Sequence, residues 1–291
     1  MLLLLMVCFW GANLAVIKVA LQHFDPLAFN CVRFILASLA MMILYRKIFR
    51  DRIDRKDLLK MLGLGVLGNT IYQLFFIHGV AFSNVSHVAI LLGVTPIFTA
   101  SISTFLGIER VSKLLWLGIL LSFSGVVLIV FGGGGFDRGN WQIILGDAFV
   151  FLASVAWAVY TTFSQDLIRR YSSQHYILYT MLFGTLFLIP VSARALIQQK
   201  WHVLGPYDWI ALMYSSMFAL VFGYSAWYYG VQRIGSTRTS VYSNLTPVAG
   251  LMVGMLFMHD KLASLQWMGV AVIFFGLTLN RITQLRLLQP E

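Results

Sequence analysis

The chain has 291 residues, of which 59% are hydrophobic and only 11% are charged, and it carries a net charge of +10. A water-soluble protein of this length needs more polar surface, so the composition excludes an ordinary soluble domain and predicts a protein of the lipid bilayer. The basic residues lie mostly in short connections between apolar runs rather than on one solvated face. We therefore expect no nucleic-acid partner.

Ten apolar stretches are long enough to form spanning helices, since about 20 apolar residues cross the hydrocarbon layer. The expected spans are Leu2–Leu21, Leu27–Tyr45, Leu58–Phe82, His87–Gly107, Leu114–Gly132, Ile143–Phe163, Tyr176–Ile197, Trp209–Val231, Thr239–Met258 and Leu265–Arg281. The first stretch has neither a basic leading region nor a small-residue cleavage site, so we expect a retained helix rather than a signal peptide. Long runs without alternation predict an all-α membrane protein.

An internal repeat organises these helices. A shift of 151 (246 − 95) places Thr95-Pro96 on Thr246-Pro247 and Trp116 on Trp267, and it aligns residues 78–128 with 229–279 without a gap. Five helices per copy is an odd number, so the second copy must be inverted in the membrane. The predicted fold is ten transmembrane helices in two inverted five-helix repeats around a central cavity. The expected boundaries are a first repeat over 1–132, a Gly-rich linker over 133–142, a second repeat over 143–281 and a cytoplasmic tail over 282–291.

The distribution of Lys and Arg between the loops predicts the orientation. Of the basic loop residues, only Arg138, Arg194, Lys200 and Lys261 fall on the side of the Gly-rich linker, and the rest fall on the side of the termini. Because cytoplasmic loops are enriched in Lys and Arg, we expect both termini in the cytoplasm and the protein in the bacterial inner membrane.

The opening of the chain and the two Thr-Pro pairs resemble the drug/metabolite transporter superfamily. The opening resemblance consists of Phe9-Trp10-Gly11-Ala12-Asn13, Lys18, Pro26 and Arg33-Phe34. The Thr-Pro pairs, followed by Glu109 and Asp260, are similar to the paired signatures of its EamA-type members. This resemblance covers nearly the whole chain and implies a central cavity lined by helices one, three, four, six, eight and nine. It also implies export of small metabolites, and amino-acid exporters, including the aromatic type, are similar in length and pattern.

Matched polar and aromatic positions on these helices suggest where a substrate binds. Helices three and eight each place polar or aromatic residues on one face at helical spacing, and helices one and six add tryptophans. The candidate substrate-binding residues are Trp10, Asn13, Tyr72, Gln73, His78, Thr95, Trp157, Tyr160, Tyr224, Trp227, Tyr228, Tyr242 and Thr246. Hydrogen bonding between helices is the alternative use of such residues. Pro96 and Pro247 each remove a helical hydrogen bond and predict a gating bend or a fixed kink.

A few ionisable residues lie within the spans. Lys18 or Arg33 could attract a substrate carboxylate; the alternatives are that Lys18 snorkels to the outer headgroups and that Arg33, which lies deeper, is structural and bonds backbone carbonyl groups. His78 or Asp147 could couple transport to protons. Cys8 and Cys31 are expected to be buried thiols. No catalytic, cofactor or metal-binding pattern stands out, so we expect neither an enzyme nor a cofactor.

The sequence therefore predicts an exporter of small metabolites, most of all aromatic and other apolar amino acids, that works by alternating access. The small-molecule substrate and the bilayer are the expected partners, and a monomer is compatible with the sequence. Two alternatives stay open: a multidrug or nucleobase-type exporter of the same fold, and a non-transporting membrane scaffold or receptor. Facilitated diffusion and proton exchange are both compatible with these residues.

Overall fold

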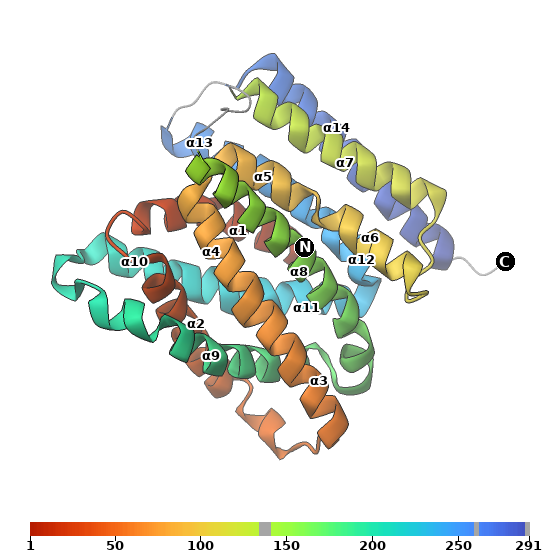
Figure 1. Cartoon of the computed structure of the whole chain (residues 1–291). Coiled ribbons are helices and arrows are strands. Elements are labelled where there is room, and N and C mark those ends of the chain that lie inside the picture. The colour runs from red at the N-terminus through yellow and green to blue at the C-terminus, as the bar shows by residue number, and fades with distance from the viewer. Residues whose placement is uncertain (134–140, 259–261, 289–291) are drawn as a thin grey trace.

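The computed structural model describes residues 1–133, 141–258 and 262–288, and all regular elements in these ranges are helices (Figure 1). Nine stretches within them are long and apolar enough to cross a membrane. The first repeat contains α1 (Leu2–Ala20), α2 (Pro26–Leu44), α3 (Arg55–Val66), α4 (Tyr72–Phe82), α5 (Val85–Gly93), α6 (Thr95–Phe105) and α7 (Lys113–Gly132). The second contains α8 (Trp141–Tyr171), α9 (Ser173–Gln198), α10 (Pro206–Tyr214), α11 (Gly223–Ile234), α12 (Ser236–Val241), α13 (Thr246–Met258) and α14 (Ser264–Leu288).

Four predicted spans consist of more than one element. In the third span, α3 passes through a π-helical segment, η2 (Leu67–Ile71), into α4, and in the eighth span α10 and α11 are joined by η4 (Ser215–Phe222) in the same way. The fourth span is divided at Val94 into α5 and α6. Its partner, the expected helix Thr239–Met258, is also interrupted: the 3-10 segment η5 (Tyr242–Leu245) separates α12 from α13. Both interruptions come directly before a Thr-Pro pair, because proline is accommodated in the first turn of a helix.

Two predicted helix ends change noticeably. The tenth helix continues beyond the expected end at Arg281 and reaches Leu288. The sixth helix continues beyond the expected end at Phe163 and reaches Tyr171. Its added turns carry polar and basic residues, with Arg169 and Arg170 in the last turn, where cations are favoured by the helix dipole. Apolar length alone underestimates such a helix, because its end extends past the hydrocarbon layer.

The helix boundaries repeat with the shift found in the sequence. The residues that begin matched helices are Tyr72 and Gly223, Val85 and Ser236, Thr95 and Thr246, and Lys113 and Ser264. In each pair the two numbers differ by 151. The π-helical segments also coincide, because residues 67–71 correspond to 218–222, which lie within η4. The duplication therefore reaches local backbone geometry that no apolar pattern specifies.

The crossing of α7 and α14 relates the two repeats (Figure 1). A Cβ on Gly118 would lie 2.8 Å from the carbonyl oxygen of Gly276, and a Cβ on Gly125 would lie 2.6 Å from that of Gly269. Contacts of 118 with 276 and of 125 with 269 require antiparallel helices. The shift of 151 exchanges these two pairs, as a two-fold axis would. The expected inverted repeat is thus confirmed at this crossing, where only glycine allows so close an approach.

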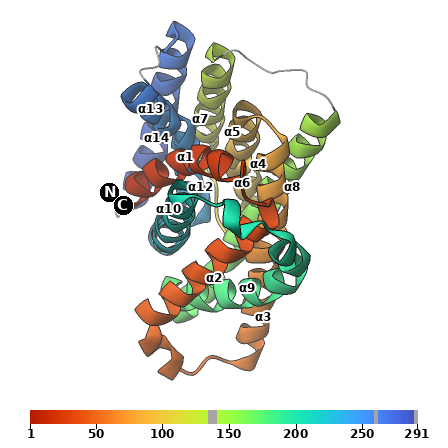
Figure 2. The same ribbon diagram turned by 90° about the vertical axis from the view of Figure 1, so that its left-hand side faces the viewer.

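The bundle has two ends, which we name for their loops. The basic end contains the α2–α3, α6–α7, α8–α9 and α11–α12 connections. The linker end contains the α1–α2, α4–α5 and α9–α10 connections and the last residues of α7. At the basic end Arg170 pairs with Asp57 at 3.2 Å, joining α8 to α3. At the linker end His23 contacts Asp208 at 3.0 Å, joining the α1–α2 connection to α10. Figure 2 shows α2, α3 and α9 forming one lobe beneath α1 and α12, with α7 and α14 on the other side.

Candidate functional site

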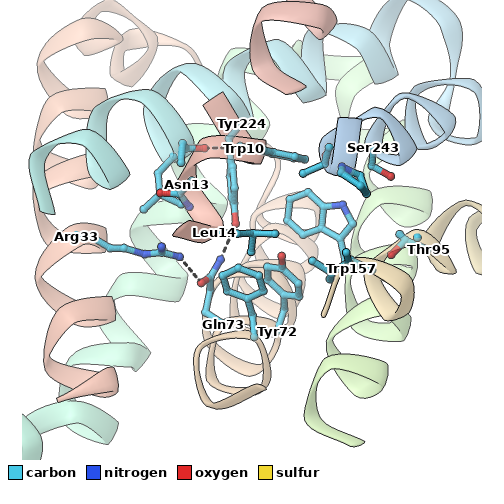
Figure 3. Close-up of a pocket in the computed structure, with 18 residues that line it drawn as sticks. Trp10, Asn13, Leu14, Arg33, Tyr72, Gln73, Thr95, Trp157, Tyr224 and Ser243 are labelled. Carbon is cyan, nitrogen blue, oxygen red and sulfur yellow. Dashed lines mark hydrogen bonds between the residues drawn. The ribbon is translucent and has the colours of Figure 1, made fainter. Parts of the chain in front are cut away.

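A central pocket of about 100 Å³ lies between the two repeats (Figure 3). Its walls come from α1, α2, α4, α5, α6, α8, η4, α11, η5 and α13. Of the residues expected to bind substrate or bend a helix, those that line it are Trp10, Asn13, Tyr72, Gln73, Thr95, Trp157, Tyr224, Thr246 and Pro247. These residues were selected from six different predicted spans, and in the structure they line the same pocket.

A hydrogen-bonded chain forms the polar wall of the central pocket. The Arg33 guanidinium donates from Nη2 to Gln73 Oε1 at 2.8 Å, and Gln73 Nε2 donates to Tyr224 Oη at 2.9 Å (Figure 3). Arg33 also donates from Nη1 to Ser215 Oγ at 3.0 Å. The chain links α2, α4 and α11, so it holds a positive charge at the seam between the repeats. Arg33 is only 2% exposed.

Aromatic rings form the opposite wall. The Trp157 ring lies 4.8 Å from the Tyr72 ring and 6.0 Å from the Trp10 ring, centroid to centroid. Trp10 Nε1 donates at 2.9 Å to the carbonyl oxygen of Ala219, which lies in the π-helical segment η4. A π-helical segment shifts the regular backbone hydrogen bonds of the helix, and the Trp10 indole nitrogen bonds to a carbonyl oxygen in this segment. An apolar wall facing a few polar atoms suits a small amphipathic ligand.

Three predicted site residues lie just outside the central pocket, in what we call the aromatic cluster. It consists of Tyr160, Tyr176, Trp227 and Tyr228, all buried. The Tyr176 and Tyr228 rings are 4.9 Å apart, and the Trp227 ring is 5.6 Å from that of Trp157. Tyr160 Oη accepts a hydrogen bond from Asn69 Nδ2 at 3.1 Å and pairs with Thr180 Oγ1 at 2.9 Å. The cluster closes the pocket on one side.

The order of residues along two helices shows which side is closed. On α8 the pocket residue Trp157 is followed by Tyr160 of the cluster and then by Gln165, which lines a hollow at the basic end. On α11 the order is Tyr224, then Trp227 and Tyr228, then Val231 of the same hollow. This basic-end hollow has a volume of about 450 Å³ and is lined by Arg110, Arg169, Arg233 and Arg238. The aromatic cluster therefore separates it from the central pocket.

A second hollow, of about 290 Å³, lies at the linker end. It is bounded there by residues such as Val85, Ser86 and Gln266. The linker-end hollow and the central pocket share four lining residues, Leu14, Ala89, Thr246 and Pro247. Both therefore adjoin the proline break of the ninth span.

Three further predicted residues belong neither to the wall of the central pocket nor to the aromatic cluster. His78 Nδ1 lies 2.8 Å from the carbonyl oxygen of Leu74 in its own helix, and its ring faces Phe82 and Phe149. Tyr242 is half-buried in η5. Pro96 is buried in the first turn of α6, whereas its partner Pro247 lines the pocket.

The ionisable groups of the linker end form a contact that the sequence did not predict. Asp147 on α8 accepts a hydrogen bond from Ser83 Oγ, and its other oxygen lies 2.7 Å from His87 Nδ1 on α5. Lys18 donates to the carbonyl oxygen of Ser83 at 2.7 Å. The histidine that contacts Asp147 is thus His87, which is not among the predicted site residues. Nothing in the linear spacing could identify it, since 60 residues separate the two partners.

Comparison with known proteins identifies relatives that align with nearly the whole chain. Residues 1–131 and 144–282 match the EamA-like transporter family. An uncharacterized transporter from Archaeoglobus fulgidus is 28% identical, covering 94% of this chain and 95% of its own. A probable amino-acid metabolite efflux pump from Escherichia coli is 27% identical, covering 95% of this chain and 92% of its own. A solved crystal structure with 17% identity superposes with a TM-score of 0.80 over 98% of this chain and 97% of its own, which shows the same fold.

Proposed function

The chain belongs to the EamA-like transporter family and is a multi-pass membrane protein, and on that basis we propose that it exports apolar amino acids by alternating access. The name of the Escherichia coli relative, a probable amino-acid metabolite efflux pump, supports this substrate class. The expected absence of enzymatic activity agrees with a family of transporters.

One observation carries the proposal: the central pocket lies at the seam of two inverted repeats, among residues that the repeat relates to each other. Thr95 and Thr246 line it from matched helices, as do Gln73 and Tyr224. In inverted-repeat transporters, substrate binds at the interface of the repeats, and the two halves exchange conformations to open it to either side. A seam pocket with matched walls provides the required geometry.

The proposed orientation places the basic end in the cytoplasm of a bacterial inner membrane, following the enrichment of Lys and Arg in cytoplasmic loops. In this orientation the aromatic cluster closes the pocket toward the cytoplasm, and the linker-end hollow lies on the outer side. The described conformation then corresponds to an outward-facing state. To reach the inward-facing state, the cluster must separate while α1, α5 and α13 close over the linker end.

The segments with interrupted backbone are the proposed sites of that motion. Val94 divides the fourth span into α5 and α6, and η5 divides the ninth span into α12 and α13. In each span, one half leads to the basic end and the other half leads to the linker end. A helix divided in this way bends more easily, because the proline that follows the division has no N–H and one helical hydrogen bond is already absent there. Pro96 and Pro247 keep their predicted role as bend positions in this proposal.

Flux into proteoliposomes tests the proposal. We expect purified protein to transport radiolabelled L-phenylalanine and L-leucine, and we expect Trp157→Ala to reduce that flux at least about tenfold, because it removes one pocket wall. Trp267→Ala is the matched control, since Trp267 is 54% exposed on α14, away from the pocket. Flux of cationic dyes or nucleobases without amino acids would support a drug or nucleobase exporter instead. No flux of any solute would favour a scaffold or receptor.

A further inference from the structure

Arg33 presents a buried positive charge for which the described residues supply no carboxylate. The ion pairs within this part of the chain all involve other side chains. The partners of Arg33 are neutral: Gln73 Oε1, Ser215 Oγ and the faces of nearby phenylalanine rings at 5.8 to 6.0 Å. A charge buried in this way is costly unless an anion compensates it.

Two polar atoms at this place also lack a hydrogen-bond partner. They are Arg33 Nε, a donor, and Asn13 Oδ1, an acceptor, and both atoms are buried. Arg33 and Asn13 both line the central pocket, with 2% and 6% of their surfaces exposed. Figure 3 shows the two side chains on the same side of the pocket, with the Arg33 guanidinium directed toward Gln73. One unmet donor on a cation and one unmet acceptor on an amide thus both belong to the wall of the central pocket.

We infer that Arg33 binds the carboxylate of the transported molecule and that Asn13 accepts a hydrogen bond from its ammonium group. A zwitterionic α-amino acid carries these two groups on one carbon, and its side chain would then extend toward Trp157 and Tyr72. Charge-assisted hydrogen bonds are about twice as strong as neutral ones, so the carboxylate provides most of the discrimination. This inference deepens the proposed transport function and rests on it. It names carboxylate-bearing solutes as the substrate class and excludes cationic amines.

The position of Arg33 explains how a carboxylate could be sensed by both repeats. Gln73 connects the guanidinium to Tyr224, so the chain of hydrogen bonds crosses from the first repeat to the second. A carboxylate that draws the guanidinium toward itself weakens its bond to Gln73, since the same N–H groups are shared. Substrate binding would thereby loosen a link across the seam.

Binding to wild-type protein tests the inference without any mutation. The probes are two matched sets: L-phenylalanine, 3-phenylpropionate and 2-phenylethylamine, and L-leucine, 4-methylpentanoate and 3-methylbutylamine. Quenching of tryptophan fluorescence reports binding, because Trp10 and Trp157 line the pocket. We expect the amino acids and the carboxylic acids to bind and the amines to bind at least about tenfold more weakly. Amines that bind as well as the acids would overturn the inference.

Variants then assign the effect to the two residues. Arg33→Gln should weaken binding of both acids and amino acids by about 10- to 100-fold, and Arg33→Lys should lie between it and wild type. Asn13→Ala should weaken binding of the amino acids but not of the carboxylic acids. Lys18→Gln is the control, because Lys18 bonds to the Ser83 carbonyl oxygen outside the pocket. Unchanged acid binding in a folded Arg33→Gln protein would contradict the assignment.

The two proposals fail in different ways. If the acids bind in an Arg33-dependent manner while no amino acid is transported, the carboxylate site stands and amino-acid export is wrong. If amino acids are transported equally well by Arg33→Gln, export stands and the assignment of Arg33 is wrong.

Discussion

The two repeats share their backbone but differ in the chemistry of their matched side chains. Helix starts, π-helical segments, proline breaks and crossing glycines recur with a constant shift. In the first two helices, where the shift is 147 (157 − 10), Arg33 corresponds to Thr180 and Asn13 corresponds to Tyr160. The first repeat therefore has a cation and an amide where the second has a hydroxyl and a phenol.

These substitutions produce two different networks at equivalent places. In one, Arg33, Gln73 and Tyr224 form a chain along the wall of an open pocket. In the other, Tyr160 of the buried aromatic cluster bonds to both Asn69 and Thr180. The comparison indicates that the backbone of the scaffold keeps the symmetry of the repeats, whereas the side chains of the two networks break it. One half-site lines a pocket and carries a charge, and its partner lies among packed aromatic side chains.

The largest expected effect tests the shared scaffold. Gly125→Leu should abolish the folded bundle, because even a Cβ there would lie 2.6 Å from the carbonyl oxygen of Gly269. Overpacking that forces the backbone to move costs about 3 kcal/mol or more of folding free energy. The measurement is the yield of monodisperse protein in detergent and its Tm. Gly63→Leu is the control, since a Cβ on Gly63 meets no atom within 4 Å. Equal loss in both variants would mean that the crossing is not specific.

An intermediate effect tests whether the aromatic cluster closes the central pocket toward the basic end. Trp227→Ala should lower the free energy of unfolding by about 3 to 5 kcal/mol, because Trp227 is fully buried. In protein that still folds, the space left by the indole should join the central pocket to the basic-end hollow. We expect preloaded L-phenylalanine to leak from proteoliposomes faster than with wild type, and Trp267→Ala to show no leak. A folded Trp227→Ala protein that leaks no faster than wild type would show that the aromatic cluster is not the barrier.

Much of this fold could be predicted from the sequence, because membrane spans are long and the repeat was visible in matched Pro, Trp and Gly residues. The inverted relation followed from an odd number of helices. The interruptions at Val94 and η5 were anticipated only as bends, since a proline indicates a weakened helix without showing on which side it divides. The π-helical segments left no trace in the apolar pattern. The expected domain boundaries stay a prediction, and the predicted linker and tail lie partly outside the described residues, at 134–140 and 289–291.

The candidate site was predictable to the extent that it follows helix faces. Gln73 and Tyr224 were found because the repeat relates them, and both line the pocket. His78 was chosen for its chemistry and lies elsewhere, because spacing along one helix does not show which neighbour covers a face. Arg33 was recognised as deeply placed, but its lack of a carboxylate partner among the described residues depends on contacts 40 and 182 residues away. Only the packed structure reveals such long-range partners.

The smallest effect is expected at the position equivalent to Arg33 in the second repeat. Thr180→Val keeps the shape of the side chain but removes the hydroxyl that pairs with Tyr160 Oη at 2.9 Å. Hydrogen bonds between membrane helices contribute about 0.6 kcal/mol on average, so Tm should fall by only about 2 °C. The binding order of amino acid, acid and amine should not change, in contrast to Arg33→Gln. If Thr180→Val altered that order as strongly, the second network would also read the ligand, and the division between a recognising and a sealing repeat would be wrong.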